Sequence, residues 1–156
     1  MQIEQLYSAY LGELYGIAFF TAFAEKYSDD NHINKWQTLI QIEQITARHL
    51  KKGLERLGKV CPDVHMEMIE KGRRDAEHWL ALDWETLINT MTPWVETYAL
   101  KYRQQAIQAT EHQALFQLVQ EHEDAILAFL QAEQRQGIDS LAPLETFIGR
   151  YRNTVL

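Results

Sequence analysis

The chain has 156 residues, of which 46% are hydrophobic; this is enough for one domain with a substantial core and excludes a disordered chain. Its formal net charge of −7 argues against nucleic acid and anionic membranes as partners, since both bind basic surfaces. Cys61 is the only cysteine, which excludes an internal disulfide and a cysteine-rich zinc site. The most apolar run, residues 17–24, is too short to cross a bilayer, and no leader-like segment opens the chain, so we expect a cytoplasmic protein.

The first part of the chain predicts an antiparallel helical hairpin. Only 7 Gly and 3 Pro are present, and the apolar residues recur with helical spacing over long stretches. We expect a first helix from about Ile3 to Tyr27 and a second from about His32 to Leu57, joined by a short polar turn. Gly58 then ends the second helix as a C-terminal glycine.

A connector and a second hairpin follow. Residues 59–82 carry a weaker apolar stripe, which predicts a short, partly buried crossover helix. A third helix is expected to begin at Asp83 and to continue, kinked, through Pro93, because the apolar phase is unbroken there. After a tight turn at 110–113, a fourth helix should reach about residue 136 and end at Gly137. Asp139 or Ser140 is expected to cap a tail helix.

Glu43 and His122 lie where polar residues are unexpected. Each is central on the apolar stripe of its own helix, and an ionised carboxylate is seldom buried without a partner. We therefore predict that both side chains are buried within reach of each other, directly or through one water or ion. The neighbours of His122 at Glu121, Glu123 and Asp124 should point outward, because successive helical residues face different directions.

The order of hairpin, long crossover, hairpin and tail helix resembles the ferritin-like superfamily over roughly residues 3–136. The resemblance implies an all-α, ferritin-like four-helix bundle with a long crossover that contains a short helix, in a single helical-bundle domain over residues 1–156. In that superfamily two helices each supply a glutamate and two supply Glu-x-x-His. Glu13 and Glu43 match glutamate positions and His122 matches a motif histidine, whereas Thr46 and Val119 stand where further ligands are expected.

The resemblance thus implies a reduced metal centre with Glu13, Glu43 and His122 as ligands. Two carboxylates and one imidazole can hold Fe(II), Mn(II) or Zn(II), and the family implies iron and oxygen chemistry, as in an iron-dependent oxidase or an iron-handling protein. Iron or manganese is the cofactor expected on this interpretation. A metal-free interpretation fits the residues equally well, so the presence of a cofactor and of enzymatic activity both stay open.

Two alternatives describe the chain without that centre. In the first, Glu43 and His122 form a buried ion pair, with tyrosine hydroxyls completing its hydrogen bonds, in a non-catalytic oligomeric or adaptor bundle. The second is a haem-oxygenase-like pocket for a small molecule. The aromatic residues considered for these roles are Tyr10, Tyr98, Tyr102 and Trp84.

A second apolar stripe predicts self-association. Phe19 and Phe23 on the first helix, and Ile42 and Ile45 on the second, lie outside the main core faces. Extra apolar surface of this kind is typical of a twofold interface, so we expect a homodimer. The alternative is that the tail helix covers the same surface within one chain.

Overall fold

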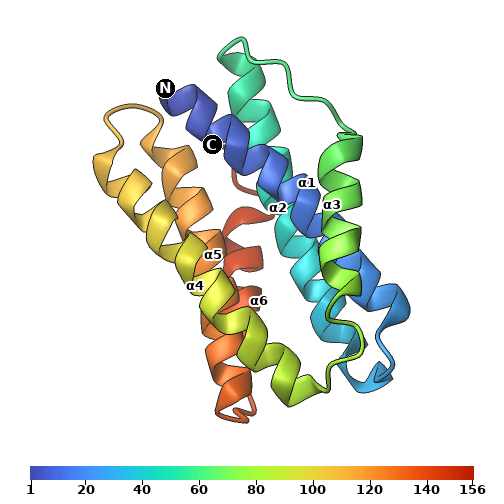
Figure 1. The fold of residues 1–156 in the computed structure, drawn as a ribbon. Coiled ribbons are helices and arrows are strands. Elements are labelled where there is room, and N and C mark those ends of the chain that lie inside the picture. Colours follow the sequence, from blue (N-terminus) through green and yellow to red (C-terminus); the bar gives the residue numbers. More distant parts are fainter. The chain divides into compact units, whose positions relative to one another are not determined.

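The computed structural model describes residues 1–156 and contains six α-helices, one short 3-10 helix and no strand (Figure 1). The all-α expectation is therefore confirmed. The chain divides into two compact units, residues 1–81 with 155–156 and residues 82–154, and each is described separately. None of the helices combines the length and the apolar character needed to cross a bilayer.

The first unit is built on a helical hairpin. Helix α1 (Gln2–Lys26) packs against α2 (Ile33–Arg56), and the short helix η1 (Asp30–His32) joins them, as the predicted turn required. Helix α2 ends at Arg56 with Leu57 as its C-cap, and Gly58 follows at a φ of 85°, the left-handed conformation that glycine adopts without strain. The Gly58 and Lys59 amides donate hydrogen bonds to carbonyls in the last turn of α2, the pattern of a Schellman ending.

Helix α3 (Met66–Glu77) is the predicted short, partly buried helix of the connector. It packs along α1, and Gly72 and Ala76 are its buried residues. The approach is closest at Gly72, where an added Cβ would lie 2.5 Å from the Tyr15 carbonyl oxygen. The Tyr15 hydroxyl also donates to Asp75 across 2.6 Å. A small residue and a cross-helix hydrogen bond thus hold α3 against the backbone of α1.

The stripe that predicted a homodimer interface is buried inside the single chain. Phe19, Phe23, Ile42 and Ile45 are each at most 3% exposed. Within the first unit, Phe23 stacks on Trp36 with ring centroids 4.6 Å apart, and Phe19 meets Trp79 edge to face at 5.8 Å. The expectation that these residues form an exposed surface was wrong, because aromatic side chains of the same chain cover part of it. A homodimer remains a prediction without an assigned surface.

The second unit contains a second hairpin and the tail helix. Helix α4 (Trp84–Gln108) packs against α5 (Gln113–Gln134), and α6 (Ala142–Tyr151) packs on α5. Helix α4 is continuous across Pro93, as the unbroken apolar phase predicted. The α4–α5 turn places His112 at φ 56°, which confirms a tight reversal there.

The ends of α5 and α6 differ from the predictions. The left-handed residue after α5 is Gln136, at φ 54°, and the helix ends at Gln134 without using Gly137 for this conformation. Leu141 occupies the N-cap of α6 and no side chain caps that helix, so neither Asp139 nor Ser140 has the expected role. The tail helix is secured instead by burial of its apolar face, which is formed by Leu144, Phe147 and Tyr151.

Asp83 caps α4 as predicted, and this interaction makes stability depend on pH. Its carboxylate accepts a 2.8 Å hydrogen bond from the Thr86 amide, and that bond lowers the pKa of Asp83 below its usual value of 3.8. A lowered pKa in the folded state stabilises the fold above the ordinary pKa, and the contribution is lost as pH falls through the folded value.

We expect Asp83→Ala to lower Tm at pH 7, and the difference from the wild type to shrink in acid below pH 3.8. Thermal unfolding followed by circular dichroism measures these Tm values. The control is Asp83→Asn, whose side chain can still cap the helix and whose Tm should stay close to that of the wild type. Equal Tm values for the wild type and both variants at pH 7 would contradict the role of Asp83 as the N-cap.

Candidate metal centre

Glu13 and Glu43 are buried carboxyl groups in the middle of α1 and α2. Their exposed fractions are 4% and 5%. Gly16 lies one turn after Glu13 on α1, and a Cβ added there would come within 2.5 Å of the Glu43 carboxyl carbon. The Glu43 carboxyl group therefore occupies space that any other residue at position 16 would fill. Sequence reasoning missed Gly16, although a glycine in mid-helix is costly enough to signal a packing role.

His122 lies on α5 and is 1% exposed. Phe147 of α6 packs edge to face against its imidazole, with ring centroids 5.9 Å apart. The Glu123 carboxylate also approaches the imidazole, with Oε2 3.5 Å from His122 Nε2 and a side chain that is 15% exposed. The prediction that Glu123 points outward was thus wrong, because its long side chain folds back to the imidazole.

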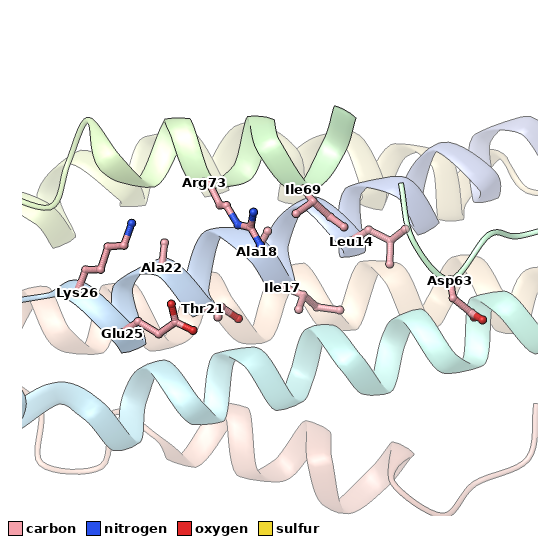
Figure 2. Close-up of a pocket in the computed structure, with 10 residues that line it drawn as sticks. All are labelled: Leu14, Ile17, Ala18, Thr21, Ala22, Glu25, Lys26, Asp63, Ile69 and Arg73. Carbon is pink, nitrogen blue, oxygen red and sulfur yellow. The ribbon is translucent and has the colours of Figure 1, made fainter. Parts of the chain in front are cut away.

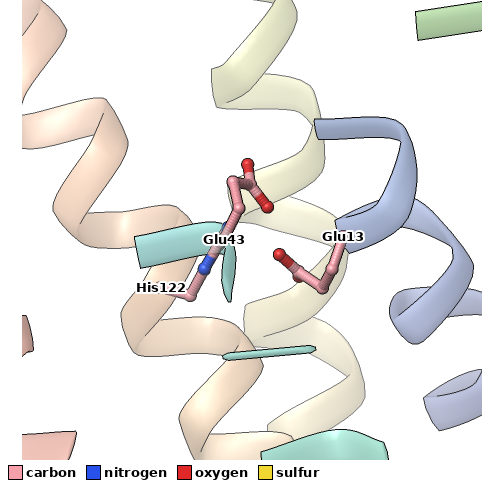
Figure 3. Close-up of side chains that lie close together, drawn as sticks. All are labelled: Glu13, Glu43 and His122. Carbon is pink, nitrogen blue, oxygen red and sulfur yellow. The ribbon is translucent and has the colours of Figure 1, made fainter. Parts of the chain in front are cut away.

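The three residues expected to bind a metal lie close together in the structure. One ligand atom from each of Glu13, Glu43 and His122 lies within 4.8 Å of the others, and all three residues are buried (Figure 3). This confirms the predicted burial of Glu43 and His122. Two donors that each lie about 2.1 Å from one ion are at most about 4.2 Å apart, which is close to the 4.8 Å limit within which these ligand atoms lie.

The donor set suits one ion better than two. Thr46 and Val119, the two positions at which the predicted ferritin-like pattern would place a histidine and a glutamate, are 0% and 2% exposed. The valine has no donor atom, so two of the usual ligand positions add no carboxylate or imidazole. One carboxylate from each of two helices and one imidazole match a mononuclear site with open coordination positions.

The aromatic residues considered for a small-molecule pocket have other roles. The Tyr10 hydroxyl donates to the Pro62 carbonyl oxygen at 2.8 Å, and burial raises its pKa. Tyr98 is 38% exposed, which corrects the expectation that it faces inward. The Trp84 indole donates to the Glu133 carboxylate at 2.9 Å. Tyr10 and Trp84 thus each have a hydrogen-bond partner within their own unit.

A surface hollow of about 310 Å³ lies in the first unit, beside α1 and α3 (Figure 2). Apolar residues such as Leu14, Ala18 and Ile69 line it together with the charged Glu25 and Arg73. Neither Glu13 nor Glu43 is among its lining residues. The hollow is thus a separate feature from the acidic group.

Comparisons with protein-family models, with curated proteins and with solved structures found no match for this chain. The assignment of the site therefore depends on its own geometry and chemistry.

Proposed function

We propose that this chain is a ferritin-like helical protein with a reduced metal centre, in which Glu13, Glu43 and His122 hold one Fe(II) or Mn(II) ion. The observation that carries the proposal is the burial of two carboxyl groups and one imidazole in mutual proximity. Buried charges are expensive unless they are paired or bind a metal, and two carboxylates neutralise one divalent cation.

The residues that pack around Glu13, Glu43 and His122 would keep these side chains in position to bind a metal ion. Gly16 leaves room for the Glu43 carboxyl group against α1, and Phe147 excludes water from one side of the His122 ring. A bound iron ion would supply the redox chemistry needed for an iron-dependent oxidase or for iron handling. Carboxylate and imidazole donors suit Fe(II) and Mn(II), and three protein ligands leave positions open for a substrate or water.

A metal-free adaptor bundle is the second candidate, and one observation favours it. Glu123 approaches His122, so the imidazole has a carboxylate neighbour without any ion. In that case the buried polar groups would favour one packing arrangement of the core over others, and the group would have no catalytic role.

Glu43→Leu distinguishes the two candidates. With a metal centre, Mn(II) or anaerobic Fe(II) should raise the Tm of the wild type, because a ligand at 100 times its Kd stabilises by about 2.7 kcal/mol. The variant should lose that rise, since one of the two carboxylates is gone. Thermal unfolding across a metal titration measures both effects.

Glu70→Leu is the matched control, because it makes the same change at an exposed position of α3. It should keep the full metal-dependent rise in Tm. In a metal-free core the wild type would show no rise, and Glu43→Leu would change stability only modestly because His122 can stay neutral.

A further inference from the structure

The hollow beside α1 and α3 combines apolar walls with charged groups (Figure 2). Every residue that lines it belongs to the first unit. Its volume of about 310 Å³ lies near the lower limit of the range of about 300–1,000 Å³ that is typical of small-molecule sites. A hollow of this size suits a ligand about as large as a single amino acid.

The α1 side of the hollow changes from apolar to charged along the helix. Leu14 and Ile17 line it at one end, and Glu25 lines it about two to three turns later. Between them, Ala18 and Ala22 are buried, and their short side chains leave room above the helix. The hollow therefore offers an apolar region and, further along α1, a charged one.

Helix α3 adds a positive charge to the charged region. Gly72 of α3 lies against Ala18 of α1, where an added Cβ would be 3.2 Å from the alanine Cβ. Further along both helices, Glu77 pairs with Lys26 at 3.4 Å, so the two helices run in the same direction. Arg73 follows Gly72, lines the hollow and reaches from α3 towards α1 (Figure 2). Its position along α1 is therefore between those of Ala18 and Lys26.

Two of the four charged lining residues already have partners. Lys26 has its ion pair with α3, and Asp63 is paired with Lys51 at 3.2 Å. Glu25 and Arg73 pair neither with each other nor with another residue of the structure. The hollow thus keeps one carboxylate and one guanidinium available for a ligand that carries both charges.

Hydrogen bonds outside the hollow hold its walls in place. The Tyr15 hydroxyl donates to Asp75 of α3 at 2.6 Å, and the Tyr10 hydroxyl donates to the carbonyl oxygen of Pro62, next to Asp63, at 2.8 Å. Both donors belong to α1, so α3 and the connector are tied to the helix that forms the floor. A site whose walls are already fixed needs little ordering when a ligand binds.

We propose that this hollow binds an α-amino acid with a large apolar side chain. Glu25 accepts hydrogen bonds from the ammonium group of the ligand, and Arg73 donates hydrogen bonds to its carboxylate. The apolar side chain of the ligand lies against Leu14 and Ile17. A zwitterion fits better than a simple anion or cation, since either of those would leave one of the two lining charges without a counterpart. The proposal does not depend on the metal centre.

Calorimetric titration of the full chain with L-phenylalanine tests the proposal. This amino acid should bind saturably. Hydrocinnamate lacks its ammonium group and phenethylamine lacks its carboxylate, and each should bind about tenfold more weakly, because one charge-assisted interaction is lost. Glycine, which has no apolar side chain, should also bind more weakly.

Two variants connect each charge of the ligand to one residue. Arg73→Met should weaken the binding of phenylalanine and hydrocinnamate by about tenfold without weakening that of phenethylamine. Glu25→Gln should weaken the binding of phenylalanine and phenethylamine without weakening that of hydrocinnamate. Arg74→Met and Glu70→Gln make the same changes at exposed positions of α3 that do not line the hollow, and they should leave all three affinities unchanged.

Three outcomes would overturn the proposal. The first is the absence of saturable binding of L-phenylalanine, and the second is equal affinity for phenylalanine and hydrocinnamate. The third is an equal loss for all three ligands in Arg73→Met, which would show that this side chain shapes the hollow without binding the carboxylate. Circular dichroism verifies the folding of each variant, and Glu25→Gln alone decides the matter if Arg73→Met does not fold. The titrations contain no metal, so their result is separate from that of the proposed function.

Discussion

Gly16→Ala is expected to weaken Mn(II) binding by about tenfold or more while leaving the fold intact. The new Cβ would lie 2.5 Å from both the carboxyl carbon and Oε1 of Glu43, closer than van der Waals contact allows. The Glu43 carboxyl group must then rotate away from α1, and a ligand displaced by an ångström no longer reaches a shared ion. Alanine has a higher helix propensity than glycine by about 1 kcal/mol. This gain offsets part of the loss of unfolding free energy that the strain causes.

Calorimetric titration with Mn(II), together with urea unfolding of the metal-free protein, separates the two effects. Gly149→Ala is the matched control, because Gly149 lies in α6 and a Cβ there meets no atom within 4 Å. It should bind Mn(II) as the wild type does and gain about 0.5–1 kcal/mol of stability. Unchanged Mn(II) affinity in Gly16→Ala would show that the Glu43 carboxyl group is not held in a binding position.

Gly72→Ala is expected to destabilise the first unit by about 1–3 kcal/mol, because overpacking at a close contact forces the backbone apart. The added Cβ would lie 2.5 Å from the Tyr15 carbonyl oxygen and 3.2 Å from the Phe19 amide nitrogen. Both are backbone atoms of α1, so the strain cannot be relieved by a side-chain rotation. Helix α3 must move outward, which also stretches the hydrogen bond from Tyr15 to Asp75.

Urea unfolding measures the loss of stability, and amide hydrogen exchange locates it. Exchange should accelerate in α3 and at the facing residues of α1, and the Gly149→Ala control should not show this change. A Gly72→Ala protein as stable as that control would mean that α3 does not depend on its close approach to α1.

Most of the helices were predictable from local pattern alone. The apolar spacing places each of the six helices close to its observed position, because the 3.6-residue period reports which face of a helix is buried. Asp83 and Gly58 mark helix ends through their own side-chain or backbone chemistry, and the structure has them in those roles. The burial of Glu43 and His122 followed from the same period, since each is central on an apolar face.

The C-terminal end of α5 and the N-terminal end of α6 were less predictable from the sequence. Several polar residues between those helices can each adopt a turn conformation or act as a cap, and the local energies differ by about 1 kcal/mol or less. Helix α6 has no side-chain cap, and its Phe147 and Tyr151 are buried; such burial depends on tertiary contacts that a local pattern does not contain.

Tertiary structure alone decided which atoms meet. The helical period predicts which way each side chain points, but it does not predict which residues pack against it. Phe19 and Phe23 therefore suggested an interface with a second chain, whereas Trp79 and Trp36 of the same chain pack against them. A long flexible side chain such as that of Glu123 can also leave its helical direction and reach a neighbour. The room for Glu43 depends on the absence of a side chain at Gly16, on a different helix, and that relation arises only when α1 and α2 pack together.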